Sequence, residues 1–144
     1  GNYDPFRLLL TLDYETIDYG SANFSPNTYY NFSQENENIS DFYARTNNTK
    51  LGVSCSMNNI SLRGGYSIFG SPFQNNLNDG EREYLSAGIG FKKDEYSFDI
   101  SMTHCMKSED QIVYQDFTLS QDYDQIANIN YKMNTVIVTC NYKF

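Results

Sequence analysis

The sequence has too few of the side chains that most catalytic and metal sites require. It contains one histidine, His104, and three cysteines, Cys55, Cys105 and Cys140. A histidine metal cluster or a catalytic triad would need more of these groups. Three cysteines cannot form a closed set of disulfides, and their spacing does not match a metal site. We therefore predict no enzymatic activity, no catalytic residue, no metal site and no cofactor.

Long apolar runs and an excess of basic residues are also absent. No stretch of 18 apolar residues occurs, which excludes a transmembrane helix, and the N-terminus lacks the charged and apolar pattern of a signal peptide. Acidic residues outnumber basic ones 18 to 10, so we expect no nucleic-acid partner. Gly1 is typical of a tag remnant. We expect the chain to be a piece of a longer protein.

The acidic side chains gather in two polar stretches that could supply oxygen ligands to Ca²⁺. Neither stretch has the spacing of an EF-hand loop, and solvated loops explain both better. The residues concerned are Glu35, Glu37 and Asp41 in the first stretch, and Glu109, Asp110, Asp116, Asp122 and Asp124 in the second.

The aromatic residues are plentiful, with 13 Tyr and 10 Phe but no Trp, and this composition favours β-structure. The segment from Lys132 to Phe144 alternates apolar and polar side chains and ends on an aromatic residue. In a strand, such alternation places the two kinds of side chain on opposite faces. A terminal strand of this kind is typical of bacterial outer-membrane barrels.

Six segments carry this alternation, and they are separated by two tight turns and three long polar connections. The pattern predicts an all-β fold, an antiparallel up-and-down meander of about six strands in a single unit over residues 1–144, with the short turns at one end and the long loops at the other. The predicted strands are Phe6–Tyr19, Thr46–Met57, Ile60–Ile68, Leu85–Phe91, Ser97–Met106 and Lys132–Phe144, and the predicted loops are Gly20–Arg45, Gly70–Arg82 and Lys107–Tyr131.

Alternation leaves open whether the apolar face contacts lipid or a protein core, because a soluble β-sandwich has the same period. Three features favour lipid. The charges within strands fall on the polar face, and aromatic residues lie near strand ends. The predicted strands, apart from the alternating core Leu85–Phe91 of the fourth, also have the roughly 9–11 residues that a bilayer crossing needs. The candidates for lining an enclosed lumen are Asp13, Glu15, Arg63 and Asp99, although they could equally serve to brace the wall through salt bridges.

Two stretches resemble the C-terminal part of outer-membrane transporters for hydrophobic compounds, the FadL and TodX type. They read RGGYSIFGSPF from Arg63 to Phe73 and NDGEREYLSAGIGFKKDEYSFDISMTH from Asn78 to His104, and the likeness covers Leu62–Phe144. The resemblance implies a porin-like wall of transmembrane β-strands in a Gram-negative outer membrane. It also implies transport of long-chain fatty acids and similar lipids through the intact barrel. It transfers no ligand-binding residue, since the family's N-terminal plug and kinked strand have no counterpart here.

The leading hypothesis is thus the C-terminal wall segment of an outer-membrane transporter, in contact with membrane lipid. Since six strands are fewer than the roughly eight of known barrels, the piece alone would self-associate, curl into a smaller barrel or need detergent. One alternative is a complete small barrel with a structural or adhesion role and extra strands at Asn27–Ser33 and Gln111–Ser120. Another is a soluble β-sandwich binding domain.

Overall fold

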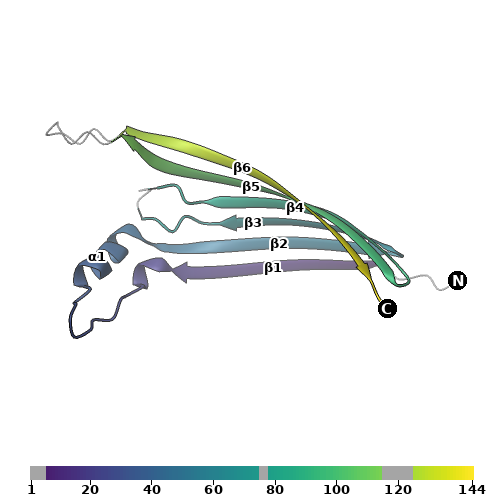
Figure 1. Ribbon diagram of the computed structural model, residues 1–144, viewed down its shortest axis with the longest axis horizontal. Coiled ribbons are helices and arrows are strands. Elements are labelled where there is room, and N and C mark those ends of the chain that lie inside the picture. The colour runs from purple at the N-terminus through teal and green to yellow at the C-terminus, as the bar shows by residue number, and fades with distance from the viewer. Residues whose placement is uncertain (1–5, 75–77, 115–124) are drawn as a thin grey trace.

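The computed structural model describes residues 6–74, 78–114 and 125–144, and most of them lie in one six-stranded antiparallel sheet (Figure 1). Each strand pairs with its neighbours in sequence, so the predicted all-β up-and-down meander is confirmed. The strands are β1 (Arg7–Asp18), β2 (Arg45–Met57), β3 (Ile60–Phe69), β4 (Arg82–Lys93), β5 (Tyr96–Tyr114) and β6 (Gln125–Tyr142).

Two tight hairpins join β2 to β3 and β4 to β5 at one end of the sheet, and the long connections lie at the other end (Figure 1). Each hairpin has two turn residues, and the first of them, Asn58 or Asp94, has a φ of 51°. Asn and Asp tolerate this left-handed region better than other non-glycine residues. We call the two ends of the sheet the hairpin end and the loop end.

The strands β5 and β6 are longer than the sequence predicted. Much of the expected loop Lys107–Tyr131 continues the β5–β6 ladder beyond the rest of the sheet, with Asp110 opposite Asn128. The Asn128 amide donates hydrogen bonds to Asp110 Oδ1 (2.9 Å) and Ser108 Oγ (3.0 Å). On β5 the residues from Lys107 to Gln111 are all polar, so this part of the strand carries no alternation for a sequence pattern to detect. On β6, Ala127, Ile129 and Tyr131 do alternate with Asn128 and Asn130, a signal that the predicted loop overlooked. The proposed extra strand at Gln111–Ser120 begins inside β5 and otherwise lies outside the described residues.

The extra strand proposed at Asn27–Ser33 is wrong. Residues 27–32 form no strand, and Ser33 begins the helix α1 (Ser33–Phe42), which follows a 3-10 turn η1 (Tyr19–Ser21). The Asn36 side chain fixes the preceding segment by accepting a bond from Phe24 N (2.7 Å) and donating one to Phe24 O (3.0 Å). Local side-chain bonds of this kind leave no periodic signal in the sequence.

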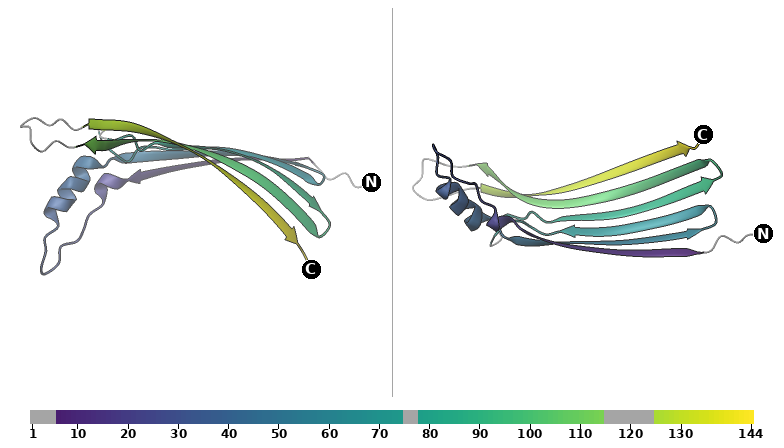
Figure 2. Two further views of the ribbon diagram at one scale, coloured as in Figure 1. Left: turned by 45° about the horizontal axis from the view of Figure 1, so that its top comes forward. Right: turned by 90° about the horizontal axis from the view of Figure 1, so that it is seen from below.

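The sheet has no hydrophobic core of its own among the described residues. No large side chain there is fully buried, and the two most buried polar residues are Thr46 and Asn48, each 5% exposed. The accessible surface is 11482 Å², against roughly 7,600 Å² for a compact monomer of this mass. The described residues form one twisted, curved layer (Figure 2), whereas a β-sandwich needs two sheets packed face to face.

The hairpin turn gives a test of how the register is set. We expect Asn58→Val to lower the free energy of unfolding by about 1–2 kcal/mol, because a β-branched residue strongly disfavours positive φ. Urea titration in detergent micelles measures this change. Asn58→Gly should preserve stability, and the control Asn59→Val should have a smaller effect, since the φ of Asn59 is not positive. Equal losses for the two valine variants would contradict this role of Asn58.

Candidate functional site

The strand register assembles continuous rows of side chains across all six strands, because residues directly opposite each other share a face. Alternate rows are apolar, and together they form what we call the apolar face. Its side chains are open to the surroundings: Leu10 is 70% exposed and Val136 62%. One row contains Leu8, Cys55, Leu62, Ile89, Ile100 and Val138, and the next contains Leu10, Val53, Gly64, Ala87, Met102 and Val136.

Aromatic rings border the apolar face at the hairpin end. Tyr142 lies between Tyr96 and Phe144, with ring centroids 4.9 Å and 5.0 Å away. Phe91 and Phe98 face each other one row further in. Such rings, with an apolar body and in tyrosine a polar tip, are the side chains that concentrate at the interface between lipid and water.

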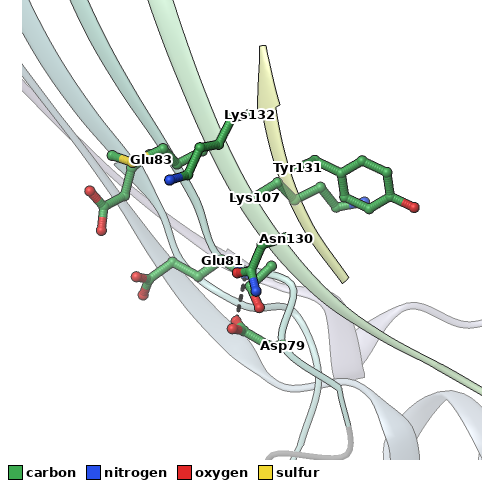
Figure 3. A pocket seen from close by; sticks show the side chains of 9 residues that line it. Asp79, Glu81, Glu83, Lys107, Asn130, Tyr131 and Lys132 are labelled. Atoms are coloured by element: carbon green, nitrogen blue, oxygen red, sulfur yellow. Dashed lines mark hydrogen bonds between the residues drawn. The ribbon is translucent and has the colours of Figure 1, made fainter. Parts of the chain in front are cut away.

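Polar and charged groups border the apolar face at the loop end, in addition to the aromatic residues that the sequence predicted near strand ends. His104 Nδ1 lies 2.6 Å from Asn134 Oδ1, and the Tyr66 hydroxyl donates a 2.9 Å hydrogen bond to Glu83. Glu83 and Lys132 also line a small hollow of about 170 Å³ with Glu81, Lys107 and other residues (Figure 3). The apolar face therefore ends in a charged rim, and a period-two pattern alone could not locate it.

The polar face carries all four residues that the sequence placed on it, and each has a partner. Lys50 Nζ lies 3.1 Å from Asp13, and the Asn48 amide donates a 3.0 Å hydrogen bond to Glu15. Arg63 Nη1 lies 3.1 Å from Asp99. The structure does not bring the four together: Asp13 and Glu15 lie toward the loop end on β1, and the Arg63–Asp99 pair lies toward the hairpin end on β3 and β5.

The Arg63–Asp99 pair crosses strand β4 over a glycine. Arg63 also donates a 3.3 Å hydrogen bond to Ser61 Oγ, and a Cβ added at Gly90 would lie only 2.4 Å from Asp99 Oδ1 and 2.6 Å from Ser61 Oγ. The absent side chain at Gly90 is what allows this network to span three strands. These residues line an open hollow of about 400 Å³ on the polar face.

The middle row of the polar face consists only of small side chains without charge, and ion pairs lie on both sides of it. The hydroxyl of Ser86 even donates to the backbone of Gly65 (3.3 Å) rather than projecting. This row contains Thr11, Gly52, Gly65, Ser86, Thr103 and Thr135.

A few apolar residues depart from the alternation. Leu9 and Ile137 both lie on the polar face, in the row next to the small side chains, and are 60% and 55% exposed. Cys55 and Cys140 lie on the apolar face, and Cys105 lies on the polar face, where it is buried.

Among the described residues, no three His, Cys, Asp or Glu side chains come close enough to hold a metal ion. In this same part of the chain, no helix combines the length and apolarity that crossing a bilayer would require. Glu35, Glu37 and Asp41 lie on α1, Glu109 and Asp110 lie on β5, and Asp116, Asp122 and Asp124 fall outside the described residues.

No family model, curated protein or solved structure matches the chain. The described residues form one layer of protein that presents an apolar band to one side and paired charges to the other.

The network over Gly90 can be tested by adding one methyl group. We expect Gly90→Ala to lower the free energy of unfolding by about 1–2 kcal/mol, because the new Cβ displaces Asp99 from Arg63 and Ser61. Chemical denaturation in lipid vesicles measures the loss.

Gly64→Ala is the matched control, because its Cβ would meet Val53 Cγ1 at an ordinary 3.5 Å. Alanine in a strand interior without a clash is neutral or stabilising by up to about 1 kcal/mol. If Gly90→Ala changes the free energy of unfolding no more than this control does, the stabilisation by the Arg63–Asp99 pair does not depend on the missing side chain at Gly90.

Proposed function

We propose that this sheet is a section of the wall of an outer-membrane β-barrel in a Gram-negative bacterium. The apolar face contacts lipid, and the polar face, with Asp13, Glu15, Arg63 and Asp99, turns toward an aqueous interior. The observation that carries this proposal is the exposed band of apolar rows, bordered by aromatic rings at one end and charges at the other. A free apolar face of this extent needs a nonpolar environment.

The height of the band supports a bilayer as that environment. Beside and along β1 the apolar face runs without interruption from Phe6 to Tyr14, all of them exposed. Eight residues rise about 27 Å along a strand, and a tilt of about 35° leaves about 22 Å along the membrane normal, close to the ~25 Å apolar band of known membrane barrels.

We further propose that the wall belongs to a transporter for hydrophobic compounds such as long-chain fatty acids. Support comes from the resemblance of Leu62–Phe144 to the FadL and TodX type, and that segment forms the continuous hairpin sheet from β3 to β6. The paired charges on the polar face would keep the interior hydrated and the wall rigid. Transport itself is assigned to the whole barrel.

The two alternatives have less support. A soluble sandwich would need a second sheet over the apolar face, and the described residues form a single sheet. A complete small barrel would need further strands, and residues 27–32 are irregular while Ser33 begins α1.

Lipid contact can be tested with a single charge. We expect Met102→Arg to lower the free energy of unfolding in lipid vesicles by about 2–4 kcal/mol, because Met102 lies in the central apolar row and arginine is costly near the bilayer midplane. Equilibrium folding titration with urea measures the change.

Thr103→Arg is the matched control, since Thr103 is the next residue on the same strand and lies on the polar face. Its cost should stay well below that of Met102→Arg. Similar costs would contradict the assignment of the faces, and so would a wild-type chain that is monomeric in water and binds no detergent.

Transport is tested separately in cells. A Gram-negative host without its own uptake route for long-chain fatty acids should take up a labelled fatty acid when it expresses the full reading frame, and the Met102→Arg variant should reduce uptake in proportion to its loss of folded protein. If the protein inserts correctly but fatty-acid uptake stays at the level of the host without it, the transport assignment is wrong and the wall assignment is unaffected.

A further inference from the structure

The two rows of the apolar face nearest the loop end change character between β3 and β4. One row begins at Leu12 and the other at Tyr14, and neither carries a charge on β1, β2 or β3. From β4 onward both rows gain ionisable or amide side chains. These are Glu83 on β4, His104 on β5, and Lys132 and Asn134 on β6, and we call them the polar sector.

The polar sector lies at the loop-end limit of the apolar face and partly inside it. Ile68 and Met106 flank Glu83 in its own row, and that row is nearer the loop end than the row of His104. Leu12, in the row of His104, is 71% exposed. In the proposed wall, polar side chains at this level are costly unless they have a partner. The sector therefore needs a partner at the same level.

The chain itself supplies only part of that partner. His104 lies 2.6 Å from Asn134, and Glu83 accepts a hydrogen bond from the Tyr66 hydroxyl. Glu83 and Lys132, however, are two strands apart, a spacing of about 10 Å. Neither belongs to an ion pair within the part of the chain that the structure describes. Both line the hollow of about 170 Å³, so the space between them is open (Figure 3).

The order of these charges suits a second copy of the same chain. A twofold axis along the membrane normal near Met106 places two apolar faces against each other and reverses the strand order in the second copy. Lys132 of each copy then meets Glu83 of the other. We propose that the polar sector is the contact of such a symmetric dimer in the membrane, with two Glu83–Lys132 pairs made between the copies. The inference rests on the proposed membrane wall and adds a partner to it.

Two other occupants suit the sector less well. An anionic lipid headgroup would pair with Lys132 but would also place its charge beside Glu83 and Glu81, which line the same hollow. A metal ion would need several ligands, and the described residues bring no such group together. A partner that carries both charges in reversed order satisfies Glu83 and Lys132 at once, and a symmetric copy has that order by construction.

Charge reversal in the full reading frame tests the dimer. Glu83→Lys and Lys132→Glu should each raise the dissociation constant for self-association at least about 30-fold, because each places like charges opposite one another at both contacts. An equal mixture of the two variants should recover association, since each variant then offers the charge that the other lacks. Sedimentation equilibrium in density-matched detergent micelles measures these constants. Lys92→Glu and Glu95→Lys are the matched controls, because they make the same charge changes near the hairpin end and should leave association unchanged.

The outcomes separate this inference from the proposed function. If the wild-type protein inserts into membranes but stays monomeric, or if the reversed variants associate as tightly as the wild type, the dimer is wrong and the membrane wall stands. If the chain binds neither detergent nor lipid, both are wrong. Glu83→Gln and Lys132→Gln remove one charge without reversing it, so they repeat the test if a reversal prevents folding. Each should raise the dissociation constant at least about tenfold, because it leaves the opposite charge unpaired at both contacts.

Discussion

The register between neighbouring strands is the constraint on which the rest of this structure depends. Because side chains alternate along a strand, a slip of one residue would exchange the two faces of that strand. Arg63 would then lie among Leu62's apolar neighbours, and Leu62 would take the place of Arg63 on the face that carries Asp99. The turns at Asn58 and Asp94 set the register of two strand pairs directly. The longer connections do not fix the register of the other strand pairs, so the matching of apolar with apolar and polar with polar faces must set it.

The same constraint makes the fold dependent on its surroundings. A sheet that separates apolar from polar side chains must bury its apolar face against something, and nothing within the described residues covers it. Among these residues β1 and β6 each pair on one side only, so each presents a free row of backbone donors and acceptors. Such edges recruit further strands. A lipid environment and additional strands would satisfy the two needs separately, the first for the face and the second for the edges.

Sequence reasoning succeeded where the chemistry of the two faces differs. The strands from β1 to β4, both hairpins, and the face occupied by Asp13, Glu15, Arg63 and Asp99 follow from alternation alone. The partners of those residues do not, because Lys50 and Asn48 are identified only by the register. The outer part of β5 and the helix α1 were missed, since Lys107–Gln111 is polar throughout and α1 has only Ile39 and Phe42 as large apolar residues. The alternation of Ala127, Ile129 and Tyr131 with asparagine on β6 was overlooked. The charged rim at Glu83 and Lys132 was also missed, because a residue can lie on the apolar face but beyond the loop-end limit of its apolar rows.

The small side chains in the middle of the polar face bear on the proposed barrel. In an eight-stranded barrel the interior is just wide enough for side chains to fill it. The middle row here offers only threonine, serine and glycine, from Thr11 on β1 to Thr135 on β6, and such residues fill little volume. A wall of this kind suits a wide interior occupied by water or by another segment of protein. In the proposed barrel, the ion pairs on the two sides of this row would brace the wall without narrowing the interior, which fits a conduit better than a self-packed small barrel.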